Sequence, residues 1–200
     1  MDINIFIYRD YETLDIFGPV EILSQIEDYR LLFFSLNGGV VTNHHGVQLI
    51  TQSAADIHPE GILLIGGGKG NRALINDQLF LDTLRDLSNR ASYVLSVCTG
   101  SALLARCGAL DNRQATSNKL SLNWVKEMGP NTNWVDEARW VVDGKFYTAS
   151  GVSAGMDMTM GFVSDQFGES KARDIATFIE YRWQEDANMD PFSIRHTERT

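Results

Sequence analysis

Residues 93–101 read YVLSVCTGS, an apolar run that ends at a cysteine followed by small residues. The run Tyr93–Val97 predicts a buried central strand, and Thr99–Cys107 predicts a helix. Cys98 is then expected at a sharp turn between the strand and the helix, which is where a nucleophile elbow holds its reactive side chain. Gly100 leaves room for such a turn. A buried strand that runs directly into a helix is typical of an α/β protein.

The rest of the chain continues this alternation of strands and helices. Short apolar runs predict strands at Ile3–Tyr8, Tyr29–Leu36, Gly61–Ile65, Arg139–Val142 and Lys145–Ala149, with short peripheral strands within Val40–Ile50 after a turn at Asn37-Gly38-Gly39. Helices are predicted from Leu14 to about Ile26 with Pro19 in the first turn, and at Asp77–Arg90, Ser153–Phe167 and Lys171–Glu185. We therefore expect a three-layer α/β sandwich, with a mostly parallel central sheet and helices on both faces.

Length and composition narrow the class of protein. The chain has 200 residues and a formal net charge of −9. This length predicts one domain over residues 1–200, whose polar tail, 186–200, is loosely held. The negative charge disfavours a nucleic-acid partner, because binding to phosphates needs clustered lysine and arginine. The two cysteines are too few for a disulfide framework, and no cysteine–histidine spacing indicates a metal site. No metal or organic cofactor is expected.

The N-terminal sequence bears on localisation. Met1-Asp2-Ile3-Asn4 lacks the basic region of a signal peptide, and the apolar runs are too short to span a membrane. We expect a cytoplasmic protein with no membrane partner.

Cys98 is the candidate reactive centre. The amides at the start of the following helix would stabilise a thiolate and lower its pKa, and the Thr99 amide would point toward an anion formed beside the sulfur. The alternative is that Cys98 is a small core residue, as buried cysteines usually are. Cys107, late in the same helix, has no such helix terminus and is expected to be structural.

Two further features fall at the carboxyl ends of the predicted strands, where sites form in parallel sheets. The glycine-rich stretch Gly66–Gly70 has neither the dinucleotide-binding nor the Walker A spacing, but its amides could complete an oxyanion hole beside Cys98. The alternative is an ordinary strand-to-loop turn. Asp15 follows the first strand, and its alternative role is to stabilise the start of a helix. Ile16, Phe17 and residues 69–73 are expected to form pocket walls.

The histidines do not provide the usual partner of a cysteine nucleophile. The four are His44 and His45 in a peripheral turn, His58 in a loop and His196 in the tail. None directly follows Cys98 or lies at the end of a central strand. The sequence thus disfavours a Cys-His-acid hydrolase, and a carboxylate is the expected acid partner, if there is one.

These residues together resemble the ThiJ/PfpI superfamily, whose fold is the flavodoxin-like fold of class I glutamine amidotransferases. Within it the chain is most similar to the isonitrile hydratase group. The motifs that carry the resemblance are LDIFGP at 14–19 with Glu21, LIGGGKG at 64–70, SVCTG at 96–100, ASGVSAGMD at 149–157, IEY at 179–181 and DPF at 190–192. They extend over nearly the whole chain.

The resemblance implies a role for each matching residue. Cys98 matches the nucleophile, Asp15 the acid that contacts its sulfur, Thr99 the neighbour that assists, and Gly68 the loop amide that faces the oxyanion. We place Gly67, Gly70 and Ile16 beside Gly68 on the substrate side. The resemblance also implies a small-molecule substrate and a homodimer. Asp15 beside a thiolate is expected to have a raised pKa, because two like charges repel each other.

Three positions depart from the family's patterns. Asn118 stands where many hydratase-like chains carry a histidine, Thr99 stands where PfpI peptidases have one, and Gly66 replaces the usual proline of the loop. Peptidase and amidotransferase activities are therefore disfavoured. Some relatives are transcription regulators with a helix-turn-helix region. Because the chain ends soon after 190–192, we expect no such region here.

Three functions remain as hypotheses. The first is a hydratase that converts an isonitrile to an N-substituted formamide through Cys98 and Asp15. The second is a cofactor-independent glyoxalase or deglycase that acts on α-oxoaldehydes. The third is a redox sensor in which Cys98 is oxidised to the sulfinic acid.

Overall fold

The computed structural model describes residues 1–193 and contains a mostly parallel sheet. Its strand order is β3-β4-β2-β1-β5-β6-β10-β9, and only the edge pairs β3–β4 and β9–β10 are antiparallel. The strands are β1 (Asp2–Phe6), β2 (Arg30–Ser35), β3 (Asn37–Thr42), β4 (Gln48–Ser53), β5 (Ile62–Ile65), β6 (Tyr93–Ser96), β9 (Trp140–Asp143) and β10 (Phe146–Ala149). Two short strands, β7 (Gln114–Ala115) and β8 (Asn133–Trp134), pair separately.

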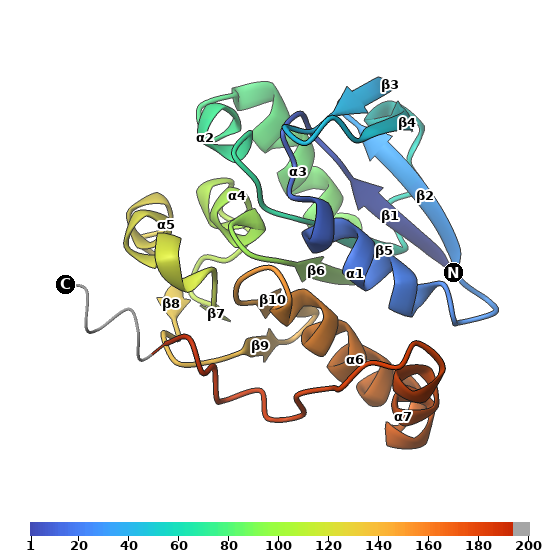
Figure 1. The fold of residues 1–200 in the computed structure, drawn as a ribbon. Coiled ribbons are helices and arrows are strands. Elements are labelled where there is room, and N and C mark those ends of the chain that lie inside the picture. The colour runs from blue at the N-terminus through green and yellow to red at the C-terminus, as the bar shows by residue number, and fades with distance from the viewer. Residues whose placement is uncertain (194–200) are drawn as a thin grey trace.

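Helices cover both faces of the sheet (Figure 1). They are α1 (Thr13–Leu23), α2 (Asn71–Leu74), α3 (Gln78–Arg90), α4 (Gly100–Arg106), α5 (Leu122–Met128), α6 (Ala154–Phe167) and α7 (Glu169–Phe178), with 3-10 turns at Ala54–Asp56 and Lys119–Ser121. The predicted three-layer α/β class is confirmed. None of the helices in residues 1–193 combines the length and the apolar character needed to cross a bilayer.

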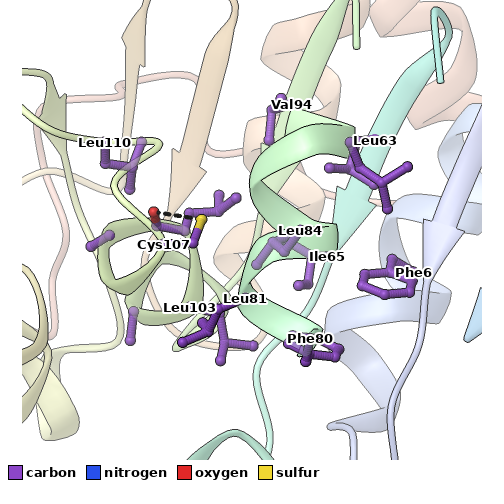
Figure 2. Packing of buried hydrophobic residues seen from close by; sticks show 14 of the residues in the cluster. Phe6, Leu63, Ile65, Phe80, Leu81, Leu84, Val94, Leu103, Cys107 and Leu110 are labelled. Atoms are coloured by element: carbon purple, nitrogen blue, oxygen red, sulfur yellow. Dashed lines mark hydrogen bonds between the residues drawn. The ribbon is translucent and has the colours of Figure 1, made fainter. Parts of the chain in front are cut away.

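Alternation along the strands divides the core into two layers. In β5, Leu63 and Ile65 pack toward α3 and α4, whereas Ile62 and Leu64 pack toward α1 and α6. Successive side chains of a strand point to opposite faces, so a strand buried on both sides is apolar throughout. Figure 2 shows the first layer, in which the rings of Phe6 and Phe80 stack with centroids 5.1 Å apart.

Four details of the sequence prediction are wrong. Pro19 lies inside α1 rather than in its first turn, because the helix begins at Thr13. The stretch Asn37-Gly38-Gly39 begins β3 instead of forming a turn. The last predicted helix ends at Phe178, where Glu180 takes a left-handed φ of 51° that stops helix propagation. The first part of the polar tail is fixed, since Asp190 is 2% exposed. Residues 194–200 of the predicted tail lie outside the described residues.

Candidate active site

Cys98 lies between the end of β6 and the start of α4, as a nucleophile elbow requires. Its φ of 57° is left-handed, a conformation that is held only when neighbouring groups fix it, because it costs about 1–3 kcal/mol. Both backbone polar groups are held. The Cys98 amide donates to the Ser150 carbonyl at 2.9 Å, and the Cys98 carbonyl accepts from the Ser117 hydroxyl at 2.8 Å. The predicted sharp turn is confirmed.

Two glycines allow the backbone to close around this turn. A Cβ on Gly100 would lie 2.7 Å from the Ile65 carbonyl oxygen, and a Cβ on Gly67 would lie 2.5 Å from the Thr99 hydroxyl. Neither distance leaves room for a side chain. The glycine loop after β5 therefore packs directly against the first turn of α4.

Asp15 is completely buried on the first turn of α1 and contacts the nucleophile. Its Oδ2 accepts from the Gly67 amide at 2.8 Å, and its carboxyl group shares a hydrogen bond with the Cys98 thiol. Its Oδ1 has no partner among residues 1–193. Burial raises the pKa of Asp15 to about 7, against the smaller lowering effect of the Gly67 amide. The predicted rise is confirmed, but its main cause is burial and not charge repulsion.

The thiol of Cys98 departs from its prediction. Burial, followed by the charge of Asp15, raises the pKa of Cys98 to about 12. The amides of Thr99 and Val152 hydrogen-bond to the sulfur and act in the opposite direction. The predicted lowering is wrong because the thiolate of the buried Cys98 loses more from desolvation than these amides restore. At pH 7 the Asp15–Cys98 pair is therefore divided between its fully protonated form and the form that carries one negative charge.

Thr99 is placed by Asn71, which the sequence indicated only as part of the pocket-wall stretch 69–73 and without a role of its own. The Asn71 side-chain amide donates to the Thr99 hydroxyl oxygen at 2.5 Å, and the Gly68 amide approaches the same oxygen at 3.5 Å. Because these groups donate to the Thr99 oxygen, the Thr99 hydroxyl can donate its own proton, and it forms a hydrogen bond with Cys98. Asn71 is fully buried. No motif marks it; the only signal is its position directly after the glycine loop.

The glycine loop meets only part of its expected role. The Gly67 amide is already bound to Asp15, and the Gly68 amide faces Thr99. Ile16 is buried and lies beside Gly66, where a Cβ would approach its side chain to 2.9 Å. Gly70 packs against the Arg9 carbonyl and the Tyr8 ring instead of against Cys98. The donors that reach the sulfur come from Thr99 and Val152.

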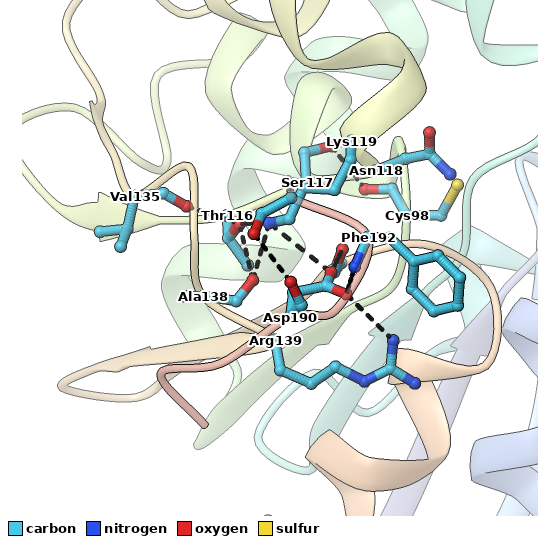
Figure 3. A network of polar contacts seen from close by, with 12 residues as sticks. Cys98, Thr116, Ser117, Asn118, Lys119, Val135, Ala138, Arg139, Asp190 and Phe192 are labelled. Carbon is cyan, nitrogen blue, oxygen red and sulfur yellow. Dashed lines mark hydrogen bonds and ion pairs between the residues drawn. The ribbon is translucent and has the colours of Figure 1, made fainter. Parts of the chain in front are cut away.

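No histidine in the described part of the chain hydrogen-bonds to Cys98. His45 approaches Thr13, its Nδ1 lying 3.4 Å from the Thr13 hydroxyl, and the His58 carbonyl accepts from Asn4. His196 lies outside the described residues. Asn118 points its amide group toward the sulfur in Figure 3, while its oxygen accepts from the Ser121 amide at 3.2 Å. Position 118, where the resemblance implies a histidine, thus carries a neutral amide.

Cys107 contrasts with Cys98, as predicted. It is 1% exposed, lies within the apolar layer of Figure 2, and its thiol donates to the Leu104 carbonyl at 3.2 Å. Burial raises the pKa of Cys107 to about 11. The described residues place no carboxylate in hydrogen-bond contact with it, so it fits a structural role.

Comparison with known proteins assigns this arrangement to a family. The model of the DJ-1/PfpI family matches residues 1–165. The chain belongs to the DJ-1/PfpI family. It is 28% identical over 182 residues to the isonitrile hydratase of Pseudomonas putida, covering 90% of this chain and 78% of that protein. It is also 28% identical to the HTH-type transcriptional regulator GlxA of Rhizobium meliloti, covering 74% of this chain but only 46% of the regulator.

The fold of this DJ-1/PfpI protein is also similar to solved structures. The crystal structure of a ThiJ/PfpI family protein from Pseudomonas syringae superposes with a TM-score of 0.84 at 24% sequence identity. The match covers 98% of this chain and 84% of that one. At this identity the similarity concerns the fold.

The pKa of Asp15 predicts how stability depends on pH. The carboxyl group binds its proton more tightly in the folded protein, where its pKa is about 7, than at its ordinary value of 3.8. Its stabilising contribution is therefore full below about pH 4 and is lost as the pH rises to about 7. We expect Asp15→Asn, which does not titrate, to gain about 3 kcal/mol relative to wild type between pH 5 and pH 8. Urea unfolding of both proteins at both pH values would measure this, and a constant difference would contradict it.

Proposed function

We propose that this DJ-1/PfpI protein hydrates isonitriles to N-substituted formamides. The observation that carries the proposal is the buried Asp15 carboxyl group in hydrogen-bond contact with the Cys98 thiol, with Thr99 beside them. One shared proton between a thiol and a carboxyl group suits a reaction that needs a nucleophile and an acid at the same carbon atom. The similarity to the Pseudomonas putida isonitrile hydratase supports the same choice.

The reaction divides into two steps that regenerate the enzyme. Asp15 takes the proton of the Cys98 thiol as the sulfur adds to the terminal carbon of R–N≡C, and passes it to that carbon, which gives the thioimidate R–N=CH–S–Cys98. Water then adds across the C=N bond: its oxygen bonds to the carbon, and Asp15 carries one of its protons to the nitrogen. The C–S bond breaks to release R–NH–CHO, and the remaining hydroxyl proton returns through Asp15 to the sulfur. No electrons are transferred to or from an outside reagent, and Thr99 orients the sulfur or the water.

The environment of Cys98 also bears on the choice between a hydratase, a glyoxalase and a redox sensor. Oxidation to the sulfinic acid follows thiolate character and exposure, whereas this thiol is buried and its pKa is raised to about 12. A raised pKa disfavours oxidation and nucleophilic attack alike, so the preference for an enzyme rests on Asp15 beside the thiol and on the similarity to the isonitrile hydratase. A glyoxalase or deglycase would use the same cysteine and acid. It would also be expected to use a histidine, and Asn118 stands at the position where the resemblance implies one. A homodimer stays a prediction.

Product analysis tests the proposal. Purified protein incubated with an aryl or alkyl isonitrile is expected to form the matching formamide in amounts well above the protein concentration. The same protein is incubated with methylglyoxal and assayed for lactate, and with peroxide and assayed for oxidised Cys98. Lactate without formamide would replace the hydratase with a glyoxalase. Oxidised Cys98 without either product would favour the sensor.

A further inference from the structure

The C-terminal segment after α7 folds back against the loops around the nucleophile. The Ala187 carbonyl accepts from the Arg139 amide at 2.7 Å, and the Asp190 amide donates to the Glu137 carbonyl at 2.9 Å. This brings the Asp190 side chain, which is completely buried, into the interior beside Lys119 and Arg139 (Figure 3). The segment thus reaches the back of the active site from a distant part of the sequence.

A balanced set of buried charges holds Asp190 there. Its carboxylate oxygens lie 3.9 Å from the Lys119 ammonium and 3.6 Å from the Arg139 guanidinium, and Arg139 also pairs with Asp157 at 2.8 Å. Lys119 further donates to the Ala138 carbonyl at 2.7 Å. Charges buried to this degree are tolerated only when they are paired. Two cations therefore match two carboxylates, and Asp190 is fixed in place.

Ser150 joins this cluster to the nucleophile. Its hydroxyl donates to Asp190 Oδ2, and its carbonyl accepts from the Cys98 amide at 2.9 Å. Ser150 also precedes Gly151 and Val152, and the Val152 amide hydrogen-bonds to the Cys98 sulfur. Val152 itself has a left-handed φ of 36°, so this loop, like the Cys98 turn, depends on its neighbours to keep its conformation.

We propose that Asp190, acting through Ser150, is a positioning residue that holds Cys98 in its left-handed turn and the Val152 amide against the sulfur. The carboxylate fixes the Ser150 hydroxyl, the Ser150 carbonyl fixes the Cys98 amide, and the next two residues carry the donor that favours the thiolate. The inference rests on Cys98 as the reactive centre but not on the identity of the substrate. Alkylation of the thiol therefore tests it without any isonitrile, so its failure is distinguishable from failure of the hydratase proposal.

Ser150→Ala is the first test, because it removes one hydroxyl and leaves all four charges in place. In a Cys107→Ala background, the rate of iodoacetamide alkylation of Cys98 is measured from about pH 6 to pH 10. A poorly placed Val152 amide stabilises the thiolate less, so the rate–pH profile is expected to move upward by about half a pH unit or more. At a fixed pH this lowers the rate about threefold. Asp186→Ala, at an exposed position of the same segment, is expected to leave the profile unchanged.

A pair of double variants separates positioning from charge balance. Asp190→Ala/Lys119→Met and Asp190→Asn/Lys119→Met both remove one cation and one carboxylate, but only the Asn variant keeps an acceptor for the Ser150 hydroxyl. We expect the Ala variant to shift the profile as Ser150→Ala does, and the Asn variant to restore it. If the profiles of all folded variants superimpose on wild type, Asp190 has a structural role only and the proposal is overturned. If a double variant does not fold, Ser150→Ala decides alone.

Discussion

Replacing Cys98 with Ala is expected to lower formamide formation at least about a thousandfold, because the atom that forms the covalent intermediate is removed. The change leaves the backbone hydrogen bonds to Ser150 and Ser117 in place, and Ala at a φ of 57° is no more strained than Cys. The fold is therefore expected to survive. Turnover is measured as formamide released per protein chain at saturating isonitrile.

Cys107→Ala is the matched control. It also removes a buried thiol, but this thiol lies at the end of α4 and does not contact Asp15 or Thr99. It is expected to keep turnover near wild type while losing some stability to the cavity it creates. Formamide formation by Cys98→Ala at more than a tenth of the wild-type rate would rule out Cys98 as the nucleophile.

Asp15→Asn is expected to have the second-largest effect, a loss of at least about a hundredfold, which is typical when a general acid–base group is removed. The Asn oxygen can still accept from the Gly67 amide, so the geometry is kept while proton transfer is lost. In wild type, kcat/KM is expected to rise with pH through about 7, as the Asp15–Cys98 pair loses its first proton. Steady-state kinetics across pH 5.5–9 would measure both effects.

The contrast with an exposed carboxylate makes this test specific. Asp28→Asn changes the net charge by the same amount at an exposed position and is expected to keep both the rate and its pH dependence. If Asp15→Asn retained the same rise near pH 7, another group would have to titrate there, and Asp15 would lose its assigned role.

The sequence predicted the central strands and the nucleophile turn because their signals are local. Gly61–Ile65 is apolar on both faces and ends at glycines, and the small residues after Cys98 permit only a tight turn. Pro19 was misplaced because proline is common in the first turn of a helix, whereas here it lies beyond it, in the body of α1. Gly38 was read as a turn because glycine weakens strands, yet edge strand β3 accepts it.

Only part of the candidate site could be predicted, because some of its contacts and its electrostatics arise only in the folded chain. Asp15 and Thr99 could be found because motifs mark them, but Asn71 contributes through a contact that only the folded chain creates. The pKa of Cys98 was predicted in the wrong direction because desolvation depends on the surrounding layers, which no local pattern records. Asp190 was predicted to be part of a polar tail, because the sequence does not show that it pairs with Lys119 and Arg139 in the protein interior.

The hydrogen bond between the Cys98 amide and the Ser150 carbonyl has a consequence for the folding pathway. These residues are far apart in the chain and meet only when β10 takes its place beside β6. Contacts between distant residues form late, because the entropy of closing the intervening loop must be overcome first. We therefore expect the nucleophile turn to take its left-handed conformation only after the sheet is assembled, so that a chain with its helices formed but β10 unpaired lacks the Cys98–Ser150 hydrogen bond.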